Sequence, residues 1–160
     1  MIRPMTPADR GTVLDLIRET GFFRPDEVQV AEELIDVALG NPDQRDYDIV
    51  VVEGPDGPDG RVAGYMTWGP TPLTIGTYDL YWMAVSPRAQ GRGHGKELVR
   101  WLEGRVAALG GRLIVIETSS TPHYEPTRKF YLGLGYRETA RIPDFYQPGD
   151  DRVIYTKRLA

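Results

Sequence analysis

The sequence predicts a mixed α/β fold whose sheet contains one parallel pair of strands. The first observation is the order of apolar runs and helical patterns, which reads β-α-α-β-β-β-α-β-α-β-β. The second is the passage from residue 77 to residue 118, where a strand, a helix and another strand follow one another; such a crossover makes the two strands parallel. The third is size: 160 residues, 41% hydrophobic and 26% charged, suit one domain. No repeat or linker interrupts the chain, so we expect a single domain over residues 1–160.

The N-terminal segment predicts a short strand followed by a helix. Residues 1–5 form the strand, and Thr6 is placed to cap the helix, with Pro7 at its first position. Gly21 ends this helix. Four apolar residues at helical spacing define its inward face: Val13, Leu14, Leu16 and Ile17.

A second helix is predicted over residues 26–39, because the sequence Gly40-Asn41-Pro42 stops it. The residues expected to face inward are Val30, Leu34, Val37 and Ala38.

A three-strand stretch follows. Residues 47–53 are dense in valine, and residues 61–68 form the return strand. The intervening residues 54–60 repeat Pro-Asp-Gly and predict a hairpin loop from their turn chemistry. Prolines 70 and 72 end the return strand, and residues 77–85 form the next one.

The second half alternates helices and strands. A helix is predicted over residues 95–109, capped by Gly110-Gly111, and the apolar run 113–116 is too short for a helix and predicts a buried central strand. The inward residues of the helix are Leu98, Val99, Leu102, Val106 and Leu109.

The C-terminal part predicts a short helix and two strands. The helix covers residues 126–134, with Gly135 at its C′ position. The strands 136–142 and 152–159 flank a predicted loop, residues 143–151.

Composition excludes several classes of protein. A net charge of -4 and a pI near 5.2 argue against a nucleic-acid binder. The absence of cysteine excludes disulfides, thiolate metal sites and a cysteine nucleophile, and we expect no metal. No run of about 18 apolar residues predicts a membrane span, and the first ten residues do not look like a signal peptide, so we expect a cytoplasmic protein.

The loop that follows residue 85 predicts an anion site. Gly91, Gly93 and Gly95 alternate between the end of a strand and the start of a helix, where backbone N–H groups and the helix dipole attract phosphate. The loop is not a P-loop. A P-loop would have glycine at position 90, which here is Gln, and Ser or Thr at position 97, which here is Glu. Strict alternation of the glycines also excludes the dinucleotide pattern G-x-G-x-x-G.

The pattern that does fit is Q-x-x-G-x-G, which resembles the acetyl-CoA pyrophosphate loop of the GNAT N-acetyltransferase superfamily. A second motif about forty residues later, Arg128 to Tyr136, is similar to the family's F-Y-x-x-L-G-F, with Tyr136 in place of Phe. The predicted element order is that of the GNAT fold, so the resemblance covers essentially the whole chain. It implies that the parallel strands splay apart around acetyl-CoA.

The resemblance implies the cofactor contacts. Backbone groups of Met83, Ala84 and Val85 would bond to the pantetheine arm. Arg88, Arg92 and Lys96 could reach the 3′-phosphate, or be solvated surface charges. The residues that would hold the pyrophosphate are Gln90, Gly91, Arg92, Gly93, His94, Gly95 and Lys96.

The resemblance also implies the proton donor. In the family the tyrosine at position 131 contacts CoA and protonates its departing thiolate. Phe130 and Leu134 are four residues apart and are expected to face the core, whereas Tyr131 is turned away by about 100°. The alternative for Tyr131 is an ordinary amphipathic core residue.

Two acids are candidates for the general base. Glu117 matches the glutamate that branches acetylating protein N-termini carry on this strand. Two more residues separate it from Tyr131 than in those branches. Asp79 lies eleven residues before Gln90, the spacing of the glutamate in histone-modifying branches. In that register the Met83 N–H faces the developing oxyanion. Either acid could instead be a hydrogen-bond acceptor at a strand end; we favour Glu117 narrowly.

One family contact is missing, because the segment before the short helix lacks the usual CoA-binding Asn. Ser119 or Thr121 could replace it. The predicted loop 143–151 holds two aromatic residues and three acids, which suit a cationic acceptor or a solvated hairpin tip.

The function implied is direct acetyl transfer to a primary amine, either a small molecule or a protein N-terminus. The rival is a non-catalytic acyl-CoA-binding module that serves as a sensor. A homodimer is compatible with the resemblance.

Overall fold

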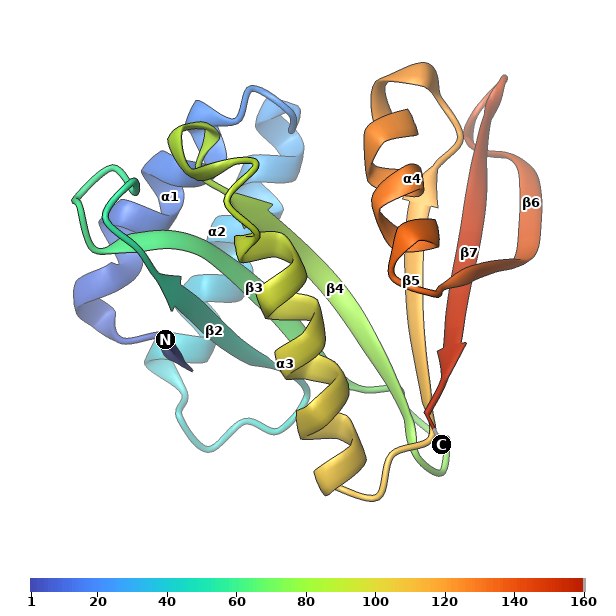
Figure 1. Ribbon diagram of the computed structural model, residues 1–160, viewed down its shortest axis with the longest axis horizontal. Helices are drawn as coiled ribbons and strands as arrows, with labels where there is room; N and C mark the ends of the chain where they lie inside the picture. Colours follow the sequence, from blue (N-terminus) through green and yellow to red (C-terminus); the bar gives the residue numbers. More distant parts are fainter. Residues whose placement is uncertain (160) are drawn as a thin grey trace. The chain divides into compact units, whose positions relative to one another are not determined.

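The computed structural model describes residues 1–159 and confirms the mixed α/β fold and the predicted order of elements (Figure 1). One seven-stranded sheet has the order β1-β2-β3-β4-β5-β7-β6. The strands are β1 (Ile2–Pro4), β2 (Asp48–Glu53), β3 (Val62–Pro70), β4 (Thr77–Val85), β5 (Leu113–Ser119), β6 (Arg137–Gln147) and β7 (Asp150–Arg158). The α-helices are α1 (Arg10–Glu19), α2 (Pro25–Gly40), α3 (His94–Ala108) and α4 (Glu125–Gly133).

The chain divides into two compact units. Unit 1 comprises Met1–Gly69 and Tyr81–Gly104, and unit 2 comprises Pro70–Leu80 and Arg105–Ala160. Strand β4 and helix α3 each contribute residues to both units. No helix within residues 1–159 has the length and apolar character that crossing a membrane requires.

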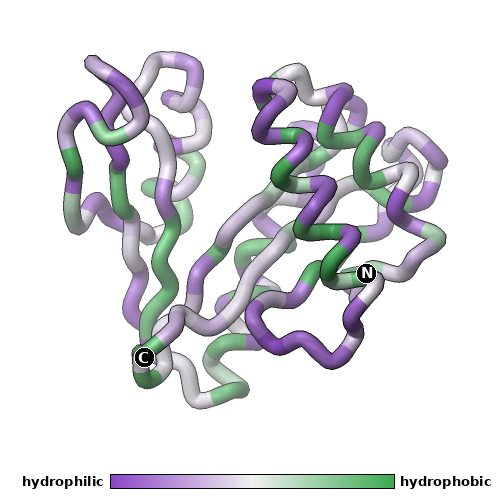
Figure 2. The backbone as a smooth tube through the Cα atoms, turned by 180° about the vertical axis from the view of Figure 1, so that it is seen from behind, coloured by the Kyte–Doolittle hydropathy of each residue, from purple (hydrophilic) through white to green (hydrophobic). Residues whose placement is uncertain are grey.

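In unit 1, helices cover both faces of the strands. Helices α1 and α2 pack on one face, where the side chains of Val51 and Tyr65 join theirs in one buried cluster. Helix α3 lies on the other face (Figure 1). There the rings of Trp101 and Trp68 contact each other edge to face, with centroids 5.9 Å apart. Green and purple alternate along the helices of unit 1 in Figure 2, as amphipathic packing requires.

The inward face of α1 is confirmed, but the one predicted for α2 is wrong in part. Ala31 and Ile35 are the buried residues of α2, and Val30 and Val37 are exposed. The helix buries instead Ala31 and Ile35, which are four residues apart on one face. Glu32 and Asp36, next to them in the sequence, form ion pairs with Arg10 of α1, at 2.8 and 2.6 Å.

Unit 2 is built around β5. Strand β5 pairs in parallel with β4 from Thr77↔Leu113 to Leu80↔Ile116, which confirms the predicted parallel pair. Its other edge pairs with β7 in antiparallel register, and β7 pairs with β6.

The predicted loop 143–151 is mostly strand. Strand β6 continues to Gln147, and β7 begins at Asp150. The pairing is irregular between Ile142 and Gln147, where Asp144 has a positive φ of 53°. Side chains stabilise this irregularity: Asp151 accepts the Asp144 N–H at 3.0 Å, and Asp144 accepts the Gly149 N–H at 2.7 Å.

Asp9 joins the N-terminal strand to α1. Its carboxylate accepts hydrogen bonds from Arg3 Nη1 at 2.7 Å and from the Thr6 N–H at 2.8 Å. These contacts, above all the one from Arg3, lower the pKa of Asp9 to about 2, from 3.8. A carboxylate whose pKa is lower in the folded state stabilises the fold above its unfolded pKa and loses that contribution as the pH falls through the folded value.

We therefore expect Asp9→Asn to lower the free energy of unfolding at pH 7 by about 2 kcal/mol. The variant should also lose less stability than the wild type between pH 4 and pH 2. Urea unfolding at several pH values measures both effects. Asp15→Asn, on the exposed side of α1, is the control and should change the free energy by less than about 0.5 kcal/mol. Unchanged stability of Asp9→Asn at pH 7 would contradict this account.

Candidate active site

The glycine loop lies in unit 1 and is anchored where it leaves β4. Ser86 is fully buried; its N–H donates to the Ala63 carbonyl at 2.8 Å, and its hydroxyl donates to the Asp56 carbonyl at 3.2 Å. A short 3-10 turn, Pro87–Ala89, follows and buries Ala89. The loop therefore starts from a fixed point on β3 and on the turn that precedes it.

The glycines of this loop are needed for backbone conformation. Gly91 and Gly93 have φ values of +78° and +88°, which L side chains rarely adopt. No atom lies within 4 Å of a Cβ built on either residue, so lack of space is not the reason for glycine. The loop leads into α3, whose first N–H groups have no acceptor inside the helix. An exposed loop that ends at a helix N-terminus is a site for an anion such as phosphate.

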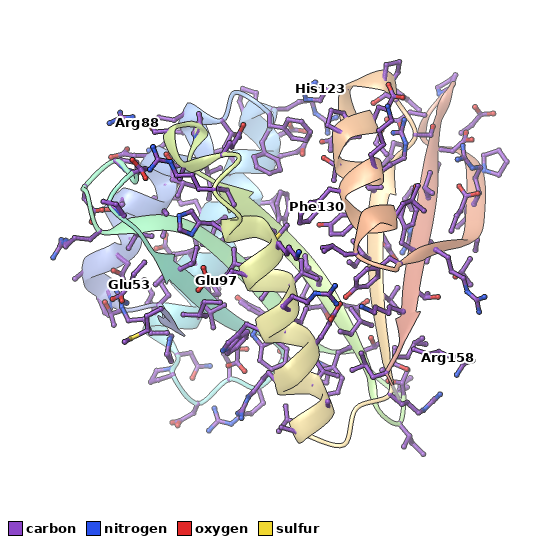
Figure 3. All side chains as sticks on the ribbon, viewed as in Figure 1. Glu53, Arg88, Glu97, His123, Phe130 and Arg158 are labelled. Carbon is purple, nitrogen blue, oxygen red and sulfur yellow. The ribbon has the colours of Figure 1, made fainter. Side chains whose placement is uncertain are left out.

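The basic side chains of the loop have carboxylate partners. Arg92 pairs with Asp56 at 2.7 Å and Arg88 with Glu19 at 3.1 Å; Arg88 is labelled in Figure 3. Lys96 is exposed at the start of α3. A phosphate could bind the donors that these ion pairs leave unused, but the neighbouring carboxylates would repel it, so the backbone N–H groups are the more favourable part of the site.

His94 holds the loop against the turn after β2, a role that the sequence did not reveal. A Cβ at Gly54 would lie 3.0 Å from His94 Nε2 and 2.9 Å from the Ala63 side chain, so the imidazole ring occupies the space that Gly54 leaves. Its Nδ1 lies 3.5 Å from a carboxylate oxygen of Glu97. Only the pairing of His94 with a glycine forty residues earlier could have signalled this contact.

At the end of β4, the backbone N–H and C=O groups of successive residues point alternately toward β3 and away from it. The Ala84 carbonyl lies only 2.9 Å from a Cβ built on Gly64 of β3, and the Ser86 N–H bonds to β3 as well. Because backbone groups of successive strand residues point to opposite edges, those of Met83 and Val85 point away from β3. Met83 and Val85 therefore have N–H and C=O groups at the strand edge where a ligand could pair.

In unit 2, Tyr131 is the buried tyrosine of α4. It is 4% exposed, and its ring contacts those of Tyr136 and Tyr155, with centroids 6.0 and 6.5 Å apart. Burial raises its pKa, so the hydroxyl stays protonated at neutral pH and can donate a proton. The expected packing of α4 is wrong in one respect: Phe130 is only partly buried, and Tyr131 packs inward against β7 instead.

The two candidate bases lie on the same face of the unit 2 sheet. Asp79 is opposite Val115, and Glu117 is two residues further along β5, so their side chains point the same way. Asp79 accepts a hydrogen bond from the Thr71 hydroxyl at 2.7 Å. Glu117 lies one residue beyond Ile116, the last residue of β5 paired with β4, and forms an ion pair with Arg152 of β7.

The candidates for the missing Asn make contacts inside unit 2. The Ser119 hydroxyl donates to Asp150 at 2.5 Å and lies 2.9 Å from the Thr121 hydroxyl. Arg128 donates to the carbonyls of Ser119 and Thr121, both at 2.8 Å. These contacts order the segment between β5 and α4.

The acids of the β6–β7 hairpin also have partners. Asp144 and Asp151 bond to backbone N–H groups, Asp151 pairs with Arg141 at 3.2 Å, and Asp150 bonds to Ser119. The aromatic residues Phe145 and Tyr146 are each 48% exposed. Within residues 1–159, no group of three His, Asp or Glu residues is arranged to hold a metal ion.

Comparisons with known proteins identify the family of the fold. Residues 45–138 match the family model described as "Acetyltransferase (GNAT) domain". A crystal structure from Desulfovibrio desulfuricans, assigned to the GNAT family of acetyltransferases, is 40% identical and superposes with a TM-score of 0.92 over 100% of this chain and 99% of that one.

Two further proteins are similar. The uncharacterized N-acetyltransferase MJ1530 of Methanocaldococcus jannaschii is 30% identical over 101 residues, which are 62% of this chain and 62% of that protein, so the match spans less than two thirds of its length. An aminoglycoside 6′-N-acetyltransferase solved with coenzyme A shares the fold, with a TM-score of 0.73 at 20% identity over 99% of this chain and 96% of that one.

Proposed function

Because this chain belongs to the GNAT family of acetyltransferases, we propose that it transfers the acetyl group of acetyl-CoA directly to a primary amine of a small molecule or a protein N-terminus. The observation that carries the proposal is the loop before α3. Gly91 and Gly93 adopt left-handed conformations there, and the helix N-terminus follows at once. These backbone N–H groups suit the diphosphate of acetyl-CoA.

Chemistry at the amine begins with loss of a proton. An alkylammonium titrates near pH 10.4, so deprotonating it at pH 7 costs on the order of 4–5 kcal/mol. We assign the base to Glu117, which lies one residue beyond the part of β5 that pairs with β4, whereas Asp79 lies within the part of β4 that pairs with β5. A base of this kind accelerates the attack on the thioester carbonyl.

The later steps use a backbone N–H and a tyrosine hydroxyl. The Met83 N–H, which points away from β3, stabilises the negative charge that develops on the carbonyl oxygen. Tyr131, whose hydroxyl is protonated at neutral pH, gives its proton to the departing thiolate. Met83 and Val85 hydrogen-bond the pantetheine arm through their backbone.

Replacing each of the two candidate acids by its amide tests which of them is the general base. We expect Glu117→Gln to lower kcat/KM by about 10²–10⁴-fold, because a general base contributes that much. Asp79→Asn, the matched control on the same face, should cost less than about 10-fold. Initial rates between pH 6 and pH 9 measure both. The reverse order of effects would move the base to Asp79.

Two measurements test the function itself. Titration calorimetry should detect binding of CoA and acetyl-CoA, and acetyl-CoA with a panel of primary amines should release free thiol. Heat of binding without thiol release on any amine would favour a non-catalytic acyl-CoA-binding module. No heat with either ligand would contradict the use of this loop for the cofactor.

A further inference from the structure

Glu117 has a cationic neighbour on the face where we place the acceptor. Arg152 of β7 forms an ion pair with it through Nη2, and the Arg152 guanidinium carbon lies 4.8 Å from the centroid of the Phe145 ring. The register explains the contact: Arg152 is opposite Ser119 on β5, two residues from Glu117, so both side chains emerge on one face. They remain accessible, Arg152 at 27% exposure and Glu117 at 37%.

The charge of Arg152 has unused hydrogen-bonding capacity. A guanidinium has five N–H donors in a rigid plane, and its contact with Glu117 uses Nη2. Its Nε is buried and has no hydrogen-bond acceptor within residues 1–159. The side chain is 27% exposed, so a further acceptor can reach the donors that do not contact Glu117. The Phe145 ring lies within cation–π distance of the guanidinium.

The other charges of the hairpin do not favour a polycation. The carboxylates of Asp144, Asp150 and Asp151 are already bonded to backbone N–H groups, to Ser119 and to Arg141. An acceptor amine beside Glu117 would therefore meet one carboxylate and one guanidinium. A second ammonium on the same molecule would be repelled by Arg152.

We propose that the acceptor is a zwitterionic amine of the amino-acid type, whose ammonium binds Glu117 and whose neighbouring carboxylate binds Arg152; this rests on the proposed acetyl transfer. A guanidinium recognises a carboxylate through charge-assisted hydrogen bonds. The cation also favours the neutral form of an amine held beside it, which helps the amine to lose its proton. Arg152 is thus a specificity-determining residue of this site.

Pairs of amino acids and their amides test the proposal in the intact protein. For each pair, kcat/KM from thiol release should be about 10- to 100-fold higher for the acid, the range that a charge-assisted hydrogen bond provides. This order is informative because the amide has the less basic amine, which is neutral more often and would react faster without a carboxylate site. A linear diamine should be a poorer acceptor than any of the acids.

Three variants connect that preference to Arg152. Arg152→Gln should reduce the acid-to-amide ratio to within about 3-fold of unity, whereas Arg152→Lys should keep most of it. Arg158→Gln is the matched control, since this exposed arginine lies on the same strand and face (Figure 3) but opposite Leu113, and it should keep the wild-type ratio.

The outcomes separate the two claims. Turnover of amides or diamines at or above the rate of the acids, in the wild type, would overturn the zwitterionic acceptor and leave acetyl transfer standing. An unchanged ratio in folded Arg152→Gln would overturn it too. If that variant unfolds, the ratio in Arg152→Lys and in the wild type decides. Absence of thiol release with every amine would overturn the acetyl transfer on which the inference rests.

Discussion

Tyr131→Phe is expected to lower kcat by about 10²–10⁴-fold, the contribution of a general acid in a proton-transfer step. Burial raises the pKa of Tyr131, so the hydroxyl carries its proton throughout the neutral range. Phe keeps the ring that packs against Tyr136 and Tyr155 and removes only the proton donor. Single-turnover and steady-state rates between pH 6 and pH 9 measure the loss.

The control for this prediction is Tyr155→Phe. Tyr155 is a second buried tyrosine whose ring contacts that of Tyr131, so its substitution tests whether any lost hydroxyl in this cluster slows the reaction. For Tyr155→Phe we expect a kcat within about 3-fold of the wild type and an unaltered affinity for CoA. A wild-type kcat for Tyr131→Phe across the pH range would remove the proton-donor role.

The second large effect is expected from Gly91→Val combined with Gly93→Val. Both residues have positive φ, where a non-glycine residue costs of order 1–3 kcal/mol. A β-branched side chain would drive the loop into another conformation and turn its N–H groups away from the diphosphate. We expect the affinity for CoA to fall by about 10²-fold or more, as measured by titration calorimetry.

Gly104→Ala provides the control for the loop. Gly104 lies in α3, has an ordinary helical φ and has no atom within 4 Å of a Cβ built on it, so alanine fits there. The substitution should stabilise the protein by about 0.5–1 kcal/mol and leave CoA affinity unchanged. Unchanged affinity in the Gly91/Gly93 double variant would mean that the diphosphate binds elsewhere.

Local patterns were sufficient for the cofactor loop. A strand, alternating glycines and a helix are neighbours in the sequence, and the positive φ of Gly91 and Gly93 is a property of those residues themselves. The order of elements and the parallel pair of β4 and β5 follow from the same kind of information, because a short crossover allows few arrangements.

Local patterns failed where a distant residue decides the conformation. The inward face of α2 depends on which of its apolar residues meet the core in the folded protein: Ala31 and Ile35 are buried, and Val30 and Val37 are exposed. The hairpin after β6 was expected to be a loop, because nothing in its composition shows that the Asp144 and Asp151 side chains bond to its own backbone.

The acid residues of the candidate site show the same division. The sequence alone places Asp79 and Glu117 on the two strands that are predicted to pair in parallel. Only the folded sheet brings Arg152, thirty-five residues later, beside Glu117, since cross-strand register joins residues without regard to their separation in sequence. The loop proposed to hold the cofactor is therefore determined by contiguous residues, whereas the surroundings of Glu117 are set by long-range pairing between strands.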